Sequence, residues 1–229
     1  SIVNFFAVLR DDALRMRLCH KLQYTPDSRV VLDECWKLLG QPKDELAKLD
    51  PVTHAWAFLV AHLIAFRGIE NGGWCPNSHK TMQSLLNVET RLVAWAELFR
   101  EVKLECDDYR VVVQRFDSES THFNADAPYM PDTFDGVLYR HPFTVKDHEE
   151  FLRVMRGIKG TATICGYPHL LYDYFLLDWR CLEFPGRSLN GNQTRTECLW
   201  LNYRPDGSRR MDGMLITQRF VKSLGGVES

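Results

Sequence analysis

The pattern of apolar residues changes near residue 102, and this change limits the folds open to the chain. Before it, apolar residues recur at helical spacing over residues 1–20, 28–39, 51–66 and 82–101. After it, short strand-like segments alternate with helical ones, which is typical of an α/β sheet. Ligands of such sheets bind at the carboxyl ends of the strands. The sequence therefore predicts an α/β fold that includes a largely helical region.

The second part of the chain is expected to contain five strands and three helices. Thr144-Val145-Lys146-Asp147 has the form of a capping box, in which a hydroxyl and a carboxylate accept hydrogen bonds from the first backbone N–H groups of a helix. The expected strands are 102–106, 121–126, 161–166, 179–184 and 196–203, and the expected helices are 108–116, 144–157 and 169–177.

Composition excludes some classes of protein. The net charge is −2, so the chain lacks the overall basic charge that favours nucleic acid, although a local basic face is compatible with this balance. The seven cysteines are dispersed and form no C-x-x-C pair, which predicts reduced thiols in a cytoplasmic protein and no metal site. No apolar run approaches the ~20 residues of a membrane span, so no membrane partner is expected.

One tetrapeptide suggests chemistry. Asp126-Ala127-Pro128-Tyr129 follows the expected strand 121–126. A carboxylate and a neighbouring backbone carbonyl on a stiff turn can accept both N–H groups of a nucleobase amine and make its nitrogen a better nucleophile. An aromatic ring beside them can hold the base by stacking. The same residues also suit an ordinary turn after a strand.

Longer segments around this tetrapeptide resemble the Dam-like family of adenine-specific DNA methyltransferases. The resemblance covers nearly the whole chain, keeps the segments in order, and is most specific over residues 102–203. It implies a Rossmann-like methyltransferase sheet with a mostly helical DNA-recognition insertion. It also implies S-adenosylmethionine as cofactor and double-stranded DNA as partner. The segments are "SIVNFFAVLR", "LECDDYRVVVQRFDSESTHFNADAPYMPDT", "YRHPFTVKDHEEFL", "GIKGTATICGYPHLLYDYFLLDWR" and "TECLWLNY".

The resemblance also assigns catalytic roles. Asp126 and the carbonyl of Ala127 would hold the adenine amine, Pro128 would stiffen the turn, and Tyr129 would stack on the flipped base. Asp108 would contact the adenine of the cofactor. Its neighbour Asp107 is expected to be solvated or to cap the following helix.

The resemblance further divides the chain into domains. Residues 1–39 and 102–229 would form the methyltransferase-like domain, and residues 40–101 the target-recognition region. The candidates for contacts with DNA phosphates or bases are Arg67, His79, Lys80, Arg91, Arg140 and His141.

The sequence departs from the family pattern in two places. Ala127 replaces the first proline of the family's Asp-Pro-Pro-Tyr motif; the backbone carbonyl is kept and some stiffness is lost, so lowered activity is expected. The family's glycine-rich cofactor loop precedes the segment that matches Val3-Asn4-Phe5-Phe6, and no later Gly-x-Gly pattern replaces it. The chain is then a fragment, or a second chain supplies the loop, or the protein no longer methylates.

Three functions remain open at this point. They are adenine methylation in DNA, a non-catalytic DNA-binding or assembly role on the same fold, and methylation of another amine such as that of cytosine or an RNA base.

Overall fold

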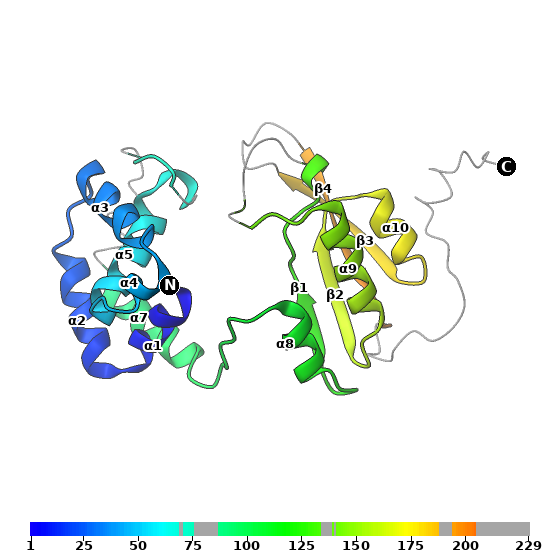
Figure 1. The fold of residues 1–229 in the computed structure, drawn as a ribbon, viewed down its shortest axis with the longest axis horizontal. Coiled ribbons are helices and arrows are strands. Elements are labelled where there is room, and N and C mark those ends of the chain that lie inside the picture. The colour runs from blue at the N-terminus through cyan, green and yellow to red at the C-terminus, as the bar shows by residue number, and fades with distance from the viewer. Residues whose placement is uncertain (69–70, 76–86, 134–138, 140, 188–193, 205–229) are drawn as a thin grey trace. The chain divides into compact units, whose positions relative to one another are not determined.

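The computed structural model of this chain describes residues 1–68, 71–75, 87–133, 139, 141–187 and 194–204 (Figure 1). The chain divides into two compact units, Ser1–Cys106 and Asp107–Ser229. Each unit has a hydrophobic core of its own. None of the described helices is long and apolar enough to cross a lipid bilayer.

The first unit is helical and is built around one central helix. Helix α5 is apolar over nearly its whole sequence and is buried on most sides, and helices α1, α2 and α3 pack against it. The described helices of this unit are α1 Ile2–Arg10, α2 Asp12–Gln23, α3 Arg29–Leu39, α4 Lys43–Leu46, α5 Pro51–Ile64 and α7 Val88–Leu98, with a 3-10 turn η1 at Phe66–Gly68.

Capping residues set where these helices begin. The expected helix over residues 1–20 is wrong as a single element, because Asp11 adopts an extended conformation and its side chain accepts a hydrogen bond from the backbone of Leu14. This bond starts a second helix after α1. Ser28 caps α3 by accepting a hydrogen bond from the backbone N–H of Val31.

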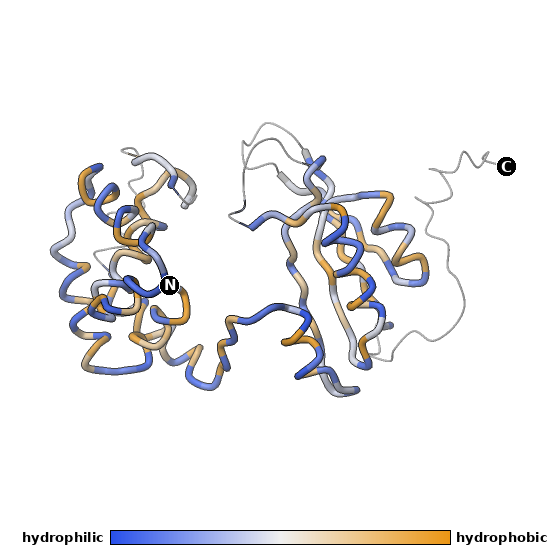
Figure 2. Tube along the Cα trace, in the orientation of Figure 1, coloured by the Kyte–Doolittle hydropathy of each residue, from blue (hydrophilic) through white to orange (hydrophobic). Residues whose placement is uncertain are grey.

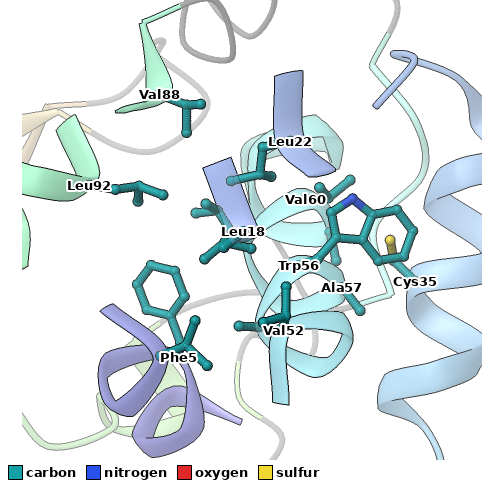
Figure 3. Packing of buried hydrophobic residues seen from close by; sticks show 14 of the residues in the cluster. Phe5, Leu18, Leu22, Cys35, Val52, Trp56, Ala57, Val60, Val88 and Leu92 are labelled. Carbon is teal, nitrogen blue, oxygen red and sulfur yellow. The ribbon is translucent and has the colours of Figure 1, made fainter. Parts of the chain in front are cut away.

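The helical unit includes residues that the sequence assigns to the other domain. Side chains from residues 1–39 share a core with α5 and α7, so the observed boundary lies at Cys106 rather than at residues 39 and 101. Figure 3 shows the packed side chains of this core, among them Phe5, Leu18, Leu22, Cys35, Val52, Trp56, Val60, Val88 and Leu92.

The expected strand at 102–106 is also wrong. This segment has no regular structure, and most of its residues are exposed. A strand needs a neighbour to satisfy its backbone groups, and none of the described strands pairs with this segment.

The second unit is a mixed α/β structure, and it confirms the other strands and helices predicted after residue 107. The strand order in the sheet is β1-β2-β4-β3, with β1 parallel to β2, and β4 antiparallel to both β2 and β3. The strands are β1 His122–Ala125, β2 Thr161–Gly166, β3 Arg180–Arg187 and β4 Thr194–Leu201; the helices are α8 Tyr109–Phe116, α9 Val145–Arg156 and α10 Leu170–Phe175, with a 3-10 turn η2 at Pro131–Thr133.

The three helices of this unit share one core with one face of the sheet. Residues of β2 alternate between buried and half-buried, and the buried Ala162 and Ile164 lie in the same cluster as Leu152 and Met155 of α9. Helix α9 is amphipathic, as its alternating colours in Figure 2 show, and it starts with the predicted capping box. In that box Thr144 and Asp147 accept hydrogen bonds from each other's backbone N–H groups.

Candidate active site

Strand directions bring three chain segments to one edge of the sheet. Strands β1 and β2 are parallel, and Ala125 lies opposite Ile164, so the residues that follow both strands meet at this edge. Strand β4 runs the other way, and Gly166 pairs with Cys198. The first residues of β4 therefore lie beside the last residues of β2.

Tyr129 is held at this edge by two contacts. Its ring meets the ring of Tyr167 in an edge-to-face arrangement, with centroids 4.5 Å apart and planes at 75°. Its hydroxyl donates a hydrogen bond to Glu197 Oε2 at 3.2 Å. Burial raises the pKa of Tyr129 above its ordinary value, and the negative charges of Glu197 and Asp126 raise it further. The phenol is therefore protonated at neutral pH and acts as a donor.

Asp126 is the exposed carboxylate of the cluster. No described residue forms a hydrogen bond with its side chain, which leaves both oxygens able to accept from a ligand. Its charge acts on its neighbours, because it contributes to raising the pKa values of Tyr129, Tyr139 and Cys165, after the larger effect of burial. The raised pKa keeps Cys165 protonated, so this thiol is not an activated nucleophile.

The turn that carries Asp126 is held by packing against the hydrophobic core of the second unit. Ala127 packs against the core of the unit, and Met130 is buried in it. These two contacts fix the backbone on either side of Pro128. The carbonyl of residue 127 thus lies on a segment whose position is set by packing as well as by proline.

Arg195 connects the start of β4 to the loop after the motif. Its guanidinium lies 5.2 Å from the centre of the Tyr167 ring, and its Nη1 donates a hydrogen bond to the carbonyl of Thr133 at 2.9 Å. On the same turn, Asp132 Oδ2 lies 3.2 Å from His169 Nε2. The edge therefore combines three carboxylates, those of Asp126, Asp132 and Glu197, with a guanidinium and aromatic rings. Such a set can accept hydrogen bonds from an amine and hold a flat ring.

Asp108 has a different environment from the one expected. It caps α8, accepting hydrogen bonds from the backbone N–H of Arg110 at 2.9 Å and from Arg110 Nε and Nη2 at 2.8 and 2.6 Å. These bonds lower its pKa to about 2. Asp107 was expected to be solvated or to cap this helix; it is exposed, and its carboxylate accepts a hydrogen bond from the backbone N–H of Asp108. Contact between Asp108 and a cofactor stays a prediction.

Two of the candidates for DNA contacts, Arg91 and His141, have described side chains. Arg91 is exposed on α7, with its guanidinium 5.3 Å from the centre of the Trp95 ring, and His141 is exposed before α9. Arg67 lies in η1, but its side chain is outside the described part of the structure. The same holds for the whole of His79, Lys80 and Arg140. Arg91 therefore belongs to the first unit and His141 to the second, and contact of either with DNA stays a prediction.

Sequence reasoning missed Tyr167, Arg195 and Glu197. Tyr167 follows the predicted strand 161–166, so the rule that led to Asp126 could also have led to it. Arg195 and Glu197 lie at the start of a strand, and only the antiparallel direction of β4 brings them to the edge. A single sequence does not reveal that direction.

The fold and this cluster define a mixed α/β unit with a carboxylate and aromatic rings at its strand ends, joined to a helical unit. No protein-family model matches the sequence, and no curated protein matches it.

Proposed function

We propose that the chain is a methyltransferase that transfers a methyl group from S-adenosylmethionine to the exocyclic amine of adenine in double-stranded DNA. The observation that carries this proposal is the exposed Asp126 carboxylate beside the held ring of Tyr129 at the carboxyl end of β1. The resemblance of the surrounding segments to Dam-like enzymes supplies the substrate and the cofactor.

The chemistry requires a better nucleophile than a free adenine amine. Its lone pair is delocalised into the ring, and two acceptors that pull its N–H groups out of the ring plane localise that pair on nitrogen. Asp126 would supply one acceptor and the carbonyl of Ala127 the other. S-adenosylmethionine would supply the electrophilic methyl group and leave as a neutral thioether, and the amine held by Asp126 and the carbonyl of Ala127 would release one proton.

Tyr129 would hold the base during this step. Its hydroxyl donates a hydrogen bond to Glu197, and its ring contacts the ring of Tyr167. Because these contacts already restrict the side chain, little conformational freedom is lost when a base stacks on it. In a duplex the adenine must first leave the helical stack, which costs a few kcal/mol. A ring that is already positioned offsets part of this cost.

The fold supports the proposal at the level of analogy. The mixed α/β architecture of the second unit, with β1 parallel to β2, is compatible with the Rossmann-like sheet that the resemblance implies. Asp108 also fits a role toward the cofactor. Its side chain is 39% exposed, so it could accept a hydrogen bond from the cofactor's adenine while it caps α8.

Transfer of a labelled methyl group from S-adenosylmethionine to unmethylated duplex DNA tests the proposal. We expect Asp126→Ala to lower the rate by roughly 10²-fold or more, the scale measured when one preorganised polar partner of the transition state is removed. Glu119→Ala, an exposed carboxylate before β1, is the control and should leave the rate unchanged. Absence of transfer to DNA by a chain that binds the cofactor would refute the substrate assignment, and RNA and cytosine-only duplexes in the same assay identify a different amine.

A non-catalytic DNA-binding or assembly role is the second candidate. It is favoured by Ala127 in the motif and by the engagement of Asp108 with Arg110. Calorimetry of the 229-residue chain with S-adenosylmethionine separates the two candidates. Binding supports the enzyme, and DNA binding without cofactor binding supports the second role.

A further inference from the structure

We propose that Cys181, Glu183 and Cys198 form a binding site for a thiophilic divalent cation, with zinc as the best fit. One ligand atom from each residue, two sulfurs and a carboxylate oxygen, lies within 4.8 Å of the others. This inference does not depend on the proposed methyltransferase activity. The sequence predicted no metal site, because these residues have no ligand spacing along the chain.

Pairing of β3 and β4 creates the cluster. Glu183 lies directly opposite Cys198 in the antiparallel register, and Cys181 lies two residues before Glu183 on the same strand. Side chains two residues apart on a strand share a face, so all three project from the same side of the sheet. Cys198 is buried in the core of the unit, Cys181 is half-buried against it, and Glu183 is exposed.

The donor set suits zinc better than the hard cations. Thiolates prefer zinc and other soft or borderline metals, whereas magnesium and calcium prefer sites made of oxygen atoms alone. With Zn–S distances of about 2.3 Å and Zn–O distances of about 2.0–2.2 Å, tetrahedral ligands lie roughly 3.5–3.8 Å apart. The three ligand atoms are at most 4.8 Å apart, so side-chain rotations that close the longest separation by about 1 Å or less would bring them to this spacing. Water would fill the fourth position.

The position of the cluster gives it a structural role. Cys198 directly follows Glu197 in β4, and consecutive strand residues point to opposite faces. A bound ion would therefore join β3 to β4 directly behind the residue that accepts the Tyr129 hydrogen bond, without touching a substrate. It would hold the strand that presents Arg195 and Glu197.

Binding would be coupled to pH. Thiols must lose their protons to bind zinc, so an ion at this site releases up to two protons. We therefore expect zinc affinity to rise with pH until both thiols are ionised. Protection of the sheet by zinc should follow the same dependence.

The test uses the full chain, purified with reductant, freed of metal with a chelator, and titrated with zinc and separately with cobalt(II). We expect one equivalent to bind, a thiolate-to-cobalt charge-transfer band in the near ultraviolet, and slower hydrogen exchange in β3 and β4. Cys181→Ser and Glu183→Gln should each weaken zinc binding by roughly 10–100-fold. These positions are chosen because they are less buried than Cys198, so the variants are expected to fold.

Two controls match these variants. Cys165→Ser removes a thiol from the opposite face of the sheet, and Cys106→Ser removes an exposed thiol from the other unit. Both should bind zinc as the parent chain does. The proposal is overturned by absence of the thiolate–cobalt band, by equal affinity in the Cys181 and Glu183 variants, or by a Cys181–Cys198 disulfide whose reduced form does not bind zinc.

Discussion

At the residue scale, Ala127 replaces a proline of the Dam-like motif. The proposed reaction would need only the backbone carbonyl of this residue, and packing of Ala127 against the core supplies part of the stiffness that proline would give. His148 is a titratable residue inside the core of the same unit. It is fully buried, its Nδ1 lies 2.9 Å from the hydroxyl oxygen of Tyr172, and burial lowers its pKa.

Replacing Ala127 by the proline of the Dam-like motif tests how much the stiffness of this turn matters. We expect Ala127→Pro to keep or raise turnover, by at most a few fold, because it limits the backbone without removing the carbonyl. The measurement is kcat for methyl transfer, with Thr121→Pro as a comparison outside the motif. A large fall in kcat, in a variant whose hydrogen exchange matches the parent, would contradict this account of Ala127.

The stability of the second unit should depend on pH through His148. Burial lowers its pKa, and the charge of His169 lowers it further. Below the ordinary value of about 6.5 the unfolded chain gains a proton that the folded chain resists, so the stabilisation is complete above that pH and is lost as pH falls toward the folded pKa. The slope for one proton is at most about 1.4 kcal/mol per pH unit.

Hydrogen exchange of β2 amides between pH 8 and pH 5 measures this effect, once corrected for intrinsic exchange rates. His148→Gln should flatten the dependence, and His20→Gln, at an exposed site of the first unit, should leave it unchanged. An identical slope in the parent and in His148→Gln would show that other groups cause the dependence.

At the scale of helices and strands, the sequence predicts which elements form better than it predicts how the strands pair. The capping box at Thr144, the strand over residues 161–166 and the buried helix over residues 51–66 all follow from local pattern, and the structure confirms them. The strand expected at 102–106 does not form, because a strand depends on a partner that a local pattern cannot supply. Glu197 was missed for the same reason, since the pairing of β4 decides its place.

Gly160, just before β2, lies against the backbone of the segment that leads into β1. Its backbone N–H and that of Lys159 donate hydrogen bonds to the Asp117 carboxylate. A Cβ at residue 160 would lie 2.3 Å from the carbonyl oxygen of Thr121, so the connection into β1 would have to move. We expect Gly160→Ala to destabilise the unit by about 1–3 kcal/mol.

Gly157→Ala is the matched control. Residue 157 has φ of −82°, and a Cβ there would have its nearest contact at an ordinary 3.5 Å. Urea unfolding monitored by exchange in β2 compares the two variants. Equal stabilities would show that the segment before β1 shifts without cost.

At the scale of the whole molecule, the division into two units was only partly predictable. The change from helical to alternating pattern near residue 102 lies close to the observed boundary at Cys106. The assignment of residues 1–39 came from the resemblance, and the packing of Phe5, Leu18 and Leu22 against α5 overrides it. Which helices share a core depends on contacts between distant residues, and helical periodicity does not report them.

Two separate cores predict two separately folded fragments. A site for a sequence-specific protease, inserted between Leu104 and Glu105, should be cut without loss of exchange protection in α5 or β2. The same site inserted after Lys159 is the control, because cleavage there separates α9 from β2 and should unfold the second unit. Loss of protection in either unit after the first cut would show that the cores depend on each other.

The antiparallel entry of β4 has a consequence for the order of assembly. Among the described strands, β3 joins the sheet only through β4, and the acceptor for the Tyr129 hydroxyl arrives on β4 as well. A ribosome therefore releases Asp126 and Tyr129 well before the strand that positions them. Until β4 pairs with β2, a nascent chain contains Asp126 and Tyr129 but lacks the hydrogen bond that positions the Tyr129 ring.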